Sequence, residues 1–127
     1  MQTFFKERLE QLDLGLEDRL KTNMGLLSGG QRQAVTLLMA TLCPPKLLML
    51  DEHTAALDPA TAHKVLELTK KIIAENQITT IMITHDMASA LEMGGRTIMF
   101  KDGKVALDVK DEERSGLTVT GLEERFL

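Results

Sequence analysis

The chain has 127 residues, of which 43% are hydrophobic and 27% are charged, and its formal net charge is −4. This length fits one domain or part of one, and the acidic balance argues against a non-specific nucleic-acid binder, which usually has a basic surface. No apolar run approaches the ~20 residues that span a bilayer, and the single cysteine, Cys43, excludes an internal disulfide.

Two helices are predicted in the first third of the chain. The first covers residues 4–14, with charges on one face and apolar residues at helical spacing on the other: Phe4, Phe5, Leu9 and Leu12. Ser28 is a good N-cap for the second helix. The inner face of this second helix shows the same spacing: Ala34, Val35, Leu38 and Leu42. Pro44 and Pro45 end it, because proline disfavours helix at the preceding residue and lacks a backbone N–H.

The middle of the chain predicts a strand, a helix and a second strand. Residues 47–50 form a continuous apolar run before two acids, which is typical of a fully buried central parallel strand. Asp58 as cap and Pro59 at the first helical position begin a helix that Asn76 closes. Residues 78–84 are β-branched at nearly every position and predict a second buried strand.

The last third predicts a β-hairpin between two short helices. A short helix follows the second strand, and a small helix is expected over residues 122–126. Between them, residues 96–100 and 105–109 flank an Asp-Gly pair, which is a strong hairpin signal between two apolar runs. Strands that alternate with helices predict an α/β fold with parallel central strands, flanking helices and a C-terminal β-hairpin.

A glycine pair marks the first candidate site, at the start of the second predicted helix. Its residues lie where a loop becomes a helix: Ser28, Gly29, Gly30 and Gln31. Helix N-termini expose unpaired N–H groups and a positive dipole end, and both favour phosphate. Glycines also let the backbone come close to a ligand. Taken alone, a glycine-rich helix start without a ligand is the simpler alternative.

Two acids and a histidine follow the predicted strands. The carboxyl ends of parallel strands line the crevice where α/β sheets bind ligands. Asp51 is a hard oxygen donor suited to Mg²⁺, and the adjacent Glu52 points to the other side of the strand, where it can polarise a water. His85 can hydrogen-bond a γ-phosphate or an attacking water. Taken alone, solvated acids and a structural histidine are the simpler alternatives.

Together these segments resemble the nucleotide-binding domain of ATP-binding cassette (ABC) transporters. Four segments carry the resemblance: residues 27–31 match the LSGGQ signature, residues 47–52 the Walker B strand with its catalytic glutamate, residues 56–58 the D-loop, and His85 the switch histidine. The phosphate loop, Gly-x-x-x-x-Gly-Lys-[Ser/Thr], does not occur in the 127 residues. The resemblance places this loop and the Q-loop glutamine upstream of Met1.

The resemblance implies a partial P-loop NTPase fold. Residues 1–27 would be the end of the helical subdomain, and residues 28–127 the C-terminal part of the ATPase core. Asp51 would help to hold Mg²⁺, Glu52 would be the general base and His85 would sense the γ-phosphate. Asp58 would link the two sites of a head-to-tail dimer. The signature residues would bind ATP held by the opposite subunit: Ser28, Gly29, Gly30 and Gln31.

The leading hypothesis is the ATP-hydrolysing subunit of a membrane importer. It would act with a second ABC ATPase subunit and a transmembrane permease, in the cytoplasm at the inner face of the membrane, without nucleic acid. The chain alone is expected to be inactive, because phosphoryl transfer depends on positioning and charge stabilisation that the phosphate loop would supply. Exposed apolar strand edges are expected to cause self-association.

Two alternatives stay open from the sequence. The first is a non-catalytic half-domain that pairs with an intact ABC subunit through its LSGGQ face. The second is a cassette ATPase of DNA repair or chromosome structure. It is disfavoured, because such proteins usually separate these motifs with long insertions, whereas here the signature lies close to Asp51 and no zinc-binding cysteines occur.

Overall fold

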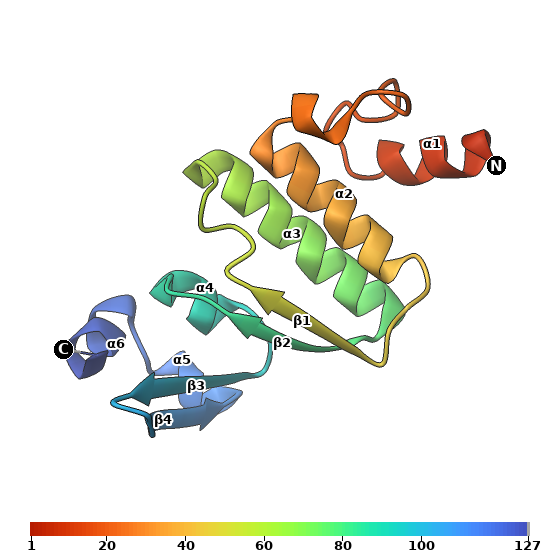
Figure 1. Ribbon diagram of the computed structural model, residues 1–127. Coiled ribbons are helices and arrows are strands. Elements are labelled where there is room, and N and C mark those ends of the chain that lie inside the picture. Colours follow the sequence, from red (N-terminus) through yellow and green to blue (C-terminus); the bar gives the residue numbers. More distant parts are fainter. Residues whose placement is uncertain (127) are drawn as a thin grey trace. The chain divides into compact units, whose positions relative to one another are not determined.

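The computed structural model describes residues 1–126, and the chain divides into two compact units between Ile83 and Thr84. The first unit contains α1 (Gln2–Glu10), the 3₁₀ turn η1 (Met24–Leu26), α2 (Gly29–Thr41), β1 (Leu47–Asp51), α3 (Pro59–Asn76) and β2 (Thr79–Ile83). The second contains α4 (Met87–Glu92), β3 (Arg96–Lys101), β4 (Lys104–Lys110), α5 (Glu112–Ser115) and α6 (Val119–Phe126) (Figure 1). Helices and strands alternate, so the predicted α/β class is confirmed. Within residues 1–126, no helix is both long and apolar enough to cross a membrane.

In the first unit, β1 and β2 form a parallel pair that packs on two helices. The strands pair from Leu47 with Thr79 to Asp51 with Ile83, as predicted. Helices α2 and α3 run side by side along one face of this pair (Figure 1). Four buried side chains join these elements: Leu37, Leu48, Ile72 and Ile78. Burial of each such side chain contributes about 1.5–3 kcal/mol, so this cluster fixes the strands against the helices.

The first helix is shorter than predicted, and its two phenylalanines lie outside the core. α1 ends at Glu10, and the chain then turns through Asp13 and Gly15, whose φ angles are 52° and 68°. Phe4 is 49% exposed and packs edge-on against Phe5. The buried residues of this region come from the segments after the helix and meet α2: Leu12, Leu16, Leu27 and Ala34. The predicted helical stripe is therefore interrupted, because Leu12 lies beyond the end of α1 and is buried, whereas Phe4 and Phe5 on the helix are exposed.

The two strands are less buried than the sequence predicts. Within residues 1–126, β1 pairs only with β2, and α2 and α3 cover one face of that pair. Successive side chains of a strand point to opposite faces, so the other face is open. Four large apolar side chains lie on this open sheet face with exposed fractions of 46%, 69%, 51% and 51%: Leu47, Met49, Ile81 and Ile83. The expectation of two fully buried strands is therefore wrong for this chain.

We expect the open sheet face to drive self-association of the isolated chain. Burying a methionine in a contact stabilises it by about 1.5–3 kcal/mol, so replacing Met49 with lysine should weaken the association by tenfold or more. Sedimentation velocity over a range of protein concentrations measures the change.

Met39→Lys is the matched control, because Met39 is 64% exposed, close to the 69% of Met49, but belongs to α2 and not to the strand pair. This control should associate as the unmodified chain does. An unmodified chain that sediments as a monomer at all concentrations, or equal effects of the two substitutions, would contradict the expectation.

The second unit is built on the hairpin that the sequence predicts. β3 and β4 are antiparallel. Between them, Asp102 and Gly103 have φ angles of 51° and 73°, which fits a type I′ turn, because this turn needs positive φ at both central residues. The hairpin packs on α4 and α6 through a small core: Met99, Leu107 and Leu122, with Met87, Leu91, Val109 and Leu117 partly buried around it. Helix α6 begins at Val119, earlier than predicted, and α5 was not predicted.

One side chain of α5, that of Arg114, donates hydrogen bonds to carbonyls at the C-terminal end of α4. Arg114 is only 9% exposed. Its Nη1 donates a hydrogen bond of 2.5 Å to the carbonyl of Gly94, and its Nη2 donates to the carbonyls of Leu91 and Met93. A positive charge beside the last carbonyls of a helix is favourable, so Arg114 ties α5 to α4 in the second unit.

Candidate functional site

The signature segment forms the start of α2, where two reciprocal hydrogen bonds close a capping box. Ser28 Oγ accepts from the N–H of Gln31 at 3.2 Å, and Gln31 Oε1 accepts from the N–H of Ser28 at 2.9 Å. Gln31 Nε2 also donates to the carbonyl of Leu14 at 3.0 Å. The predicted helix start at Ser28 is confirmed. The oxygen and the nitrogen of the Gln31 amide thus attach the start of α2 to Ser28 and to Leu14. Ser28 itself is exposed.

The two glycines of the signature let α2 approach the start of α3. A Cβ added to Gly30 would lie 2.1 Å from Cγ2 of Thr61, and one added to Gly29 would lie 3.1 Å from Cδ2 of Leu57. Packing within the chain therefore excludes a side chain at Gly30, independently of any phosphate, whereas a Cβ at Gly29 would only be in tight contact with the end of the Leu57 side chain. The sequence left open a ligand contact or a simple glycine-rich helix start, and nothing local in it shows that Thr61 faces Gly30.

We expect Gly30→Ala to destabilise the fold through its contact with Thr61. Overpacking costs about 1–3 kcal/mol, and Thr61→Ala removes the atom that the new methyl group would meet. The double variant should therefore be more stable than the sum of the two single effects implies. Urea unfolding of the four proteins measures this coupling.

Gly25→Ala is the control, because an added Cβ there meets nothing within 4 Å. A cost for Gly25→Ala as large as that for Gly30→Ala would contradict the packing role, and so would strict additivity of the Gly30 and Thr61 substitutions.

Asp58 caps α3 as the sequence predicts. Its Oδ2 accepts a hydrogen bond of 3.1 Å from the N–H of Thr61. Hydrogen bonding to Thr61, through its side chain first and its backbone second, lowers the pKa of the Asp58 carboxyl. Pro59 follows at the first helical position. The contacts of Gly29 and Gly30 place the start of α2 beside that of α3, as Figure 1 also shows. The positive N-terminal ends of α2 and α3 thus lie close together, and Ser28 is exposed beside them. This arrangement favours the binding of a negatively charged group.

The two acids of the Walker B segment lie where β1 ends. Asp51 is its last residue and is exposed. Glu52 adopts a φ angle of 48°, which is uncommon for a residue other than glycine. Its N–H donates to the carbonyl of Ile83 at 2.9 Å, so the turn is attached to β2.

The surroundings of Asp51 fit a magnesium ion that comes with a nucleotide. Within residues 1–126, no group of three or more His, Cys, Asp or Glu side chains could hold a metal by itself. Mg²⁺ bound with phosphates needs only one or two carboxylates and takes its other ligands from phosphate oxygens and water. One exposed carboxylate at a strand end is therefore a sufficient protein contribution.

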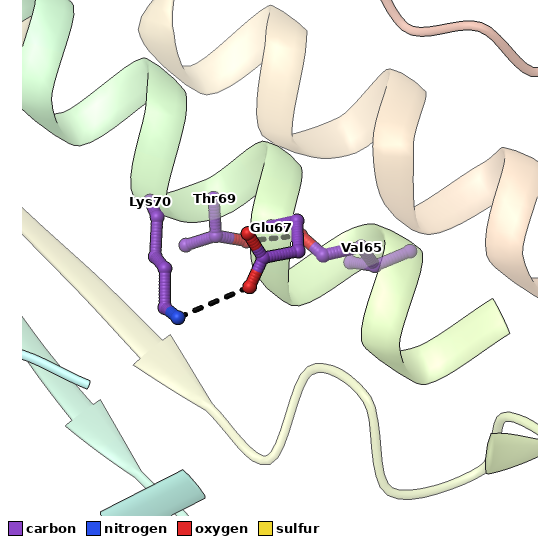
Figure 2. Close-up of polar contacts among 4 residues, drawn as sticks. All are labelled: Val65, Glu67, Thr69 and Lys70. Atoms are coloured by element: carbon purple, nitrogen blue, oxygen red, sulfur yellow. Dashed lines mark hydrogen bonds and ion pairs between the residues drawn. The ribbon is translucent and has the colours of Figure 1, made fainter. Parts of the chain in front are cut away.

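His53 is the residue of this region whose main contact the sequence does not show. Its Nε2 lies 3.1 Å from Oγ1 of Thr69, whose hydroxyl donates to the carbonyl of Val65 at 2.7 Å. Figure 2 shows the bond from Thr69 to Val65 on α3, beside the 3.0 Å ion pair of Lys70 with Glu67. Burial lowers the pKa of His53, so the ring is neutral at neutral pH.

His85 belongs to the second unit, whereas the other predicted site residues belong to the first. It is exposed and precedes Asp86, whose N–H donates to Oγ1 of Thr84 at 3.0 Å. Asp86 in turn caps α4 by accepting a hydrogen bond of 3.1 Å from the N–H of Ser89. The predicted phosphate-sensing role of His85 stays a prediction.

Known proteins with similar sequences are ATP-binding proteins of transporters. The family model described as ABC transporter matches residues 2–55. The chain is 52% identical over 118 residues to a tyrosine transport ATP-binding protein of Clostridioides difficile, covering 93% of this chain and 47% of that protein. It is 43% identical over 101 residues to a methionine import ATP-binding protein of Oceanobacillus iheyensis, covering 79% of this chain and 30% of that protein.

A solved structure agrees with these sequence relatives. The chain matches an ABC transporter assigned to the metal-chelate type, in an inward-facing conformation, with a TM-score of 0.71 and 30% identity. The match covers 95% of this chain and 46% of the solved one, so the chain spans about half the length of several proteins that it resembles. The family-model match, these relatives and the solved structure support an ABC nucleotide-binding domain that is similar to those of importers.

Proposed function

We propose that these residues supply the signature and Walker B part of an ATP-hydrolysing importer subunit. The observation that carries the proposal is the arrangement at the start of α2. There, exposed Ser28 and two close-packed glycines lie beside the capped start of α3. In this proposal, residues 1–27 are the end of the helical subdomain and residues 28–127 belong to the ATPase core.

The proposed chemistry assigns a task to each group. The Ser28 hydroxyl and the N–H groups at the start of α2 bind the γ-phosphate of an ATP held by a second subunit, with Gly29, Gly30 and Gln31 shaping this helix end. Asp51 holds Mg²⁺, which neutralises phosphate charge when bound. The Glu52 carboxylate accepts a proton from the attacking water.

Two further residues complete the proposed site. Asp58 precedes α3 and lies beside the signature segment, so it connects one nucleotide site with the other. In this proposal, His85 contacts the γ-phosphate. Asp58 is exposed at the helix start and its lowered pKa keeps the carboxyl ionised, which suits a polar contact across a subunit boundary.

The proposed partners are a second ABC ATPase subunit, arranged head to tail, and a transmembrane permease at the cytoplasmic face of the membrane. The support is that the relatives at 52% and 43% identity are named as transport and import ATP-binding proteins. These two relatives are named for the transport of tyrosine and the import of methionine, which favours an amino acid as the transported molecule.

ATP hydrolysis by a chimera tests the proposal. In the chimera, this chain replaces the segment that it matches in the C. difficile relative, to which it is 52% identical. The chimera should hydrolyse ATP only with Mg²⁺, whereas the isolated chain should not, because its 127 residues contain no phosphate loop. A folded chimera that binds ATP without hydrolysing it would contradict the proposal.

A second candidate is a non-catalytic module that pairs with an intact ABC subunit. It is favoured by the folded, exposed signature segment in a sequence without a phosphate loop. Capture of an intact relative by the immobilised chain, with and without ATP, tests it. Association that requires ATP and disappears on Ser28→Arg supports this module, and binding that is indifferent to ATP counts against it.

A further inference from the structure

We infer that His53 is a positioning residue for Glu52, because its ring attaches the turn after β1 to the buried Thr69 of α3. The inference rests on the proposed role of Glu52 in ATP hydrolysis. The residues that carry it lie within the first unit, in the turn after β1, on α3 and at the end of β2.

The backbone of Glu52 is held in an uncommon conformation from two sides. Its φ angle is 48°, in the left-handed region that side chains other than glycine rarely adopt. Its N–H donates to the carbonyl of Ile83 at 2.9 Å, and its own carbonyl accepts from the N–H of Ala55 at 3.1 Å. These bonds hold the main chain, but neither reaches beyond the strand pair and its turn to the helices.

His53 supplies the connection from this turn to a helix. Its Nε2 lies 3.1 Å from Oγ1 of Thr69, a side chain with 0% exposure. Thr69 already donates its single hydroxyl hydrogen to the carbonyl of Val65 at 2.7 Å (Figure 2). Thr69 can therefore only accept from His53, so the imidazole carries a hydrogen on Nε2. The ring is thereby fixed in one tautomer and one orientation.

The consequence concerns the direction of the neighbouring carboxylate. His53 follows Glu52 directly in the chain, so a fixed ring restricts the peptide that joins the two residues. Without this contact, the turn can relax toward negative φ, and the Glu52 side chain would then leave the strand end in a different direction. Strained backbone at a functional residue persists when its surroundings hold it, and the contact of His53 with Thr69 is such a restraint.

Histidine-detected NMR of the chain tests the contact directly. The chain contains three histidines, so a ¹⁵N-histidine spectrum at one alkaline pH resolves each ring. Met49→Lys can be included as background to limit self-association. The His53 ring should show the Nε2–H tautomer. Thr69→Val should shift the signals of His53 and the backbone carbons of Glu52, and should leave His63 and His85 unchanged.

Thr69→Ser is the conservative control, because it keeps the hydroxyl and should preserve both sets of signals. An Nδ1–H tautomer at His53 would overturn the inference. Unchanged Glu52 signals in a folded Thr69→Val chain would overturn it as well.

The chimera adds a functional readout. Thr69→Val should lower kcat about tenfold and leave the KM for ATP unchanged, because the carboxylate is displaced while the nucleotide contacts are kept. Thr69→Ser should retain kcat. An unchanged kcat in Thr69→Val would overturn the positioning role. A chimera without any ATP hydrolysis would contradict the proposed function, and the NMR result would then decide separately whether His53 holds the turn.

Discussion

Replacing Glu52 with glutamine in the chimera is expected to lower the rate of ATP hydrolysis by about 10²–10⁴-fold, the usual contribution of a general base. Glutamine keeps the size and polarity of the side chain but cannot accept a proton from water. Binding of ATP should persist, because none of the proposed phosphate contacts involves Glu52. Steady-state phosphate release and binding of a fluorescent ATP analogue measure the two properties.

Glu67→Gln is the matched control for this substitution. Glu67 is an acid of the same unit, but it lies on α3 and pairs with Lys70 at 3.0 Å on the helix surface (Figure 2). Such exposed pairs contribute little to stability, so Glu67→Gln should retain the full rate. Equal losses in the two variants, or a Glu52→Gln chimera that retains its rate, would contradict the base assigned here.

Arg114→Ala is expected to destabilise the second unit by about 2–4 kcal/mol, since hydrogen bonds to a charged group contribute roughly 1.5–3 kcal/mol each and are not additive. The substitution leaves the carbonyls of Leu91, Met93 and Gly94 at the end of α4 without their guanidinium donor. It also removes a favourable positive charge from a helix C-terminus. Hydrogen exchange of the α4 amides and urea unfolding measure the loss.

Arg96→Ala provides the comparison for Arg114. Arg96 makes two hydrogen bonds, of 2.8 and 2.6 Å, but their acceptor is the exposed carboxylate of Asp108 on the neighbouring strand. Removing such an exposed pair changes stability little. If Arg96→Ala costs as much as Arg114→Ala, or if α4 exchanges no faster in Arg114→Ala, the role assigned to Arg114 is wrong.

The Arg96 pair also has a defined pH dependence. Arg96 lowers the pKa of Asp108, mainly through their hydrogen bond. A carboxyl with a lowered folded pKa stabilises the fold above its ordinary pKa and loses that contribution as the pH falls through the lowered value. The small difference between the unmodified chain and Arg96→Ala should therefore be present at neutral pH and vanish in acid.

The sequence predicts the fold best where the signal is local. Ser28 and Asp58 each cap a helix that begins at the next residue, as predicted. The Asp-Gly turn of the hairpin is also confirmed. In these places the residues that determine the structure lie within a few positions of one another, so a short stretch of sequence contains the full physical cause.

Burial was predicted less well, because it depends on distant neighbours. The apolar run of β1 is typical of a strand covered on both faces, but helices cover only one face here and Met49 is 69% exposed. Phe4 and Phe5 fit a helical stripe, yet Leu12 and Leu16 from the following turns fill the core instead. Periodicity identifies apolar positions without showing which of them find a partner.

The candidate site shows the same division. The motif residues are recognisable in the sequence, and the structure adds what holds them: Thr61 against Gly30 and Thr69 against His53. His53 and Thr69 are 16 positions apart, and neither residue has a pattern that indicates the other. Such contacts follow from the packing of α3 against α2 and against the turn after β1, and could not be obtained from the motifs.

Complementation between two inactive chimeras tests the central claim most directly. One chimera carries Ser28→Arg and the other Glu52→Gln, and each alone should hydrolyse almost no ATP. In a mixed head-to-tail dimer, one site combines an intact Glu52 with an intact Ser28 from the opposite subunit. Mixing should therefore restore a clear fraction of the unmodified rate. If both chimeras bind ATP and dimerise but the mixture is no faster than either alone, Ser28 and Glu52 do not act in the shared site proposed here.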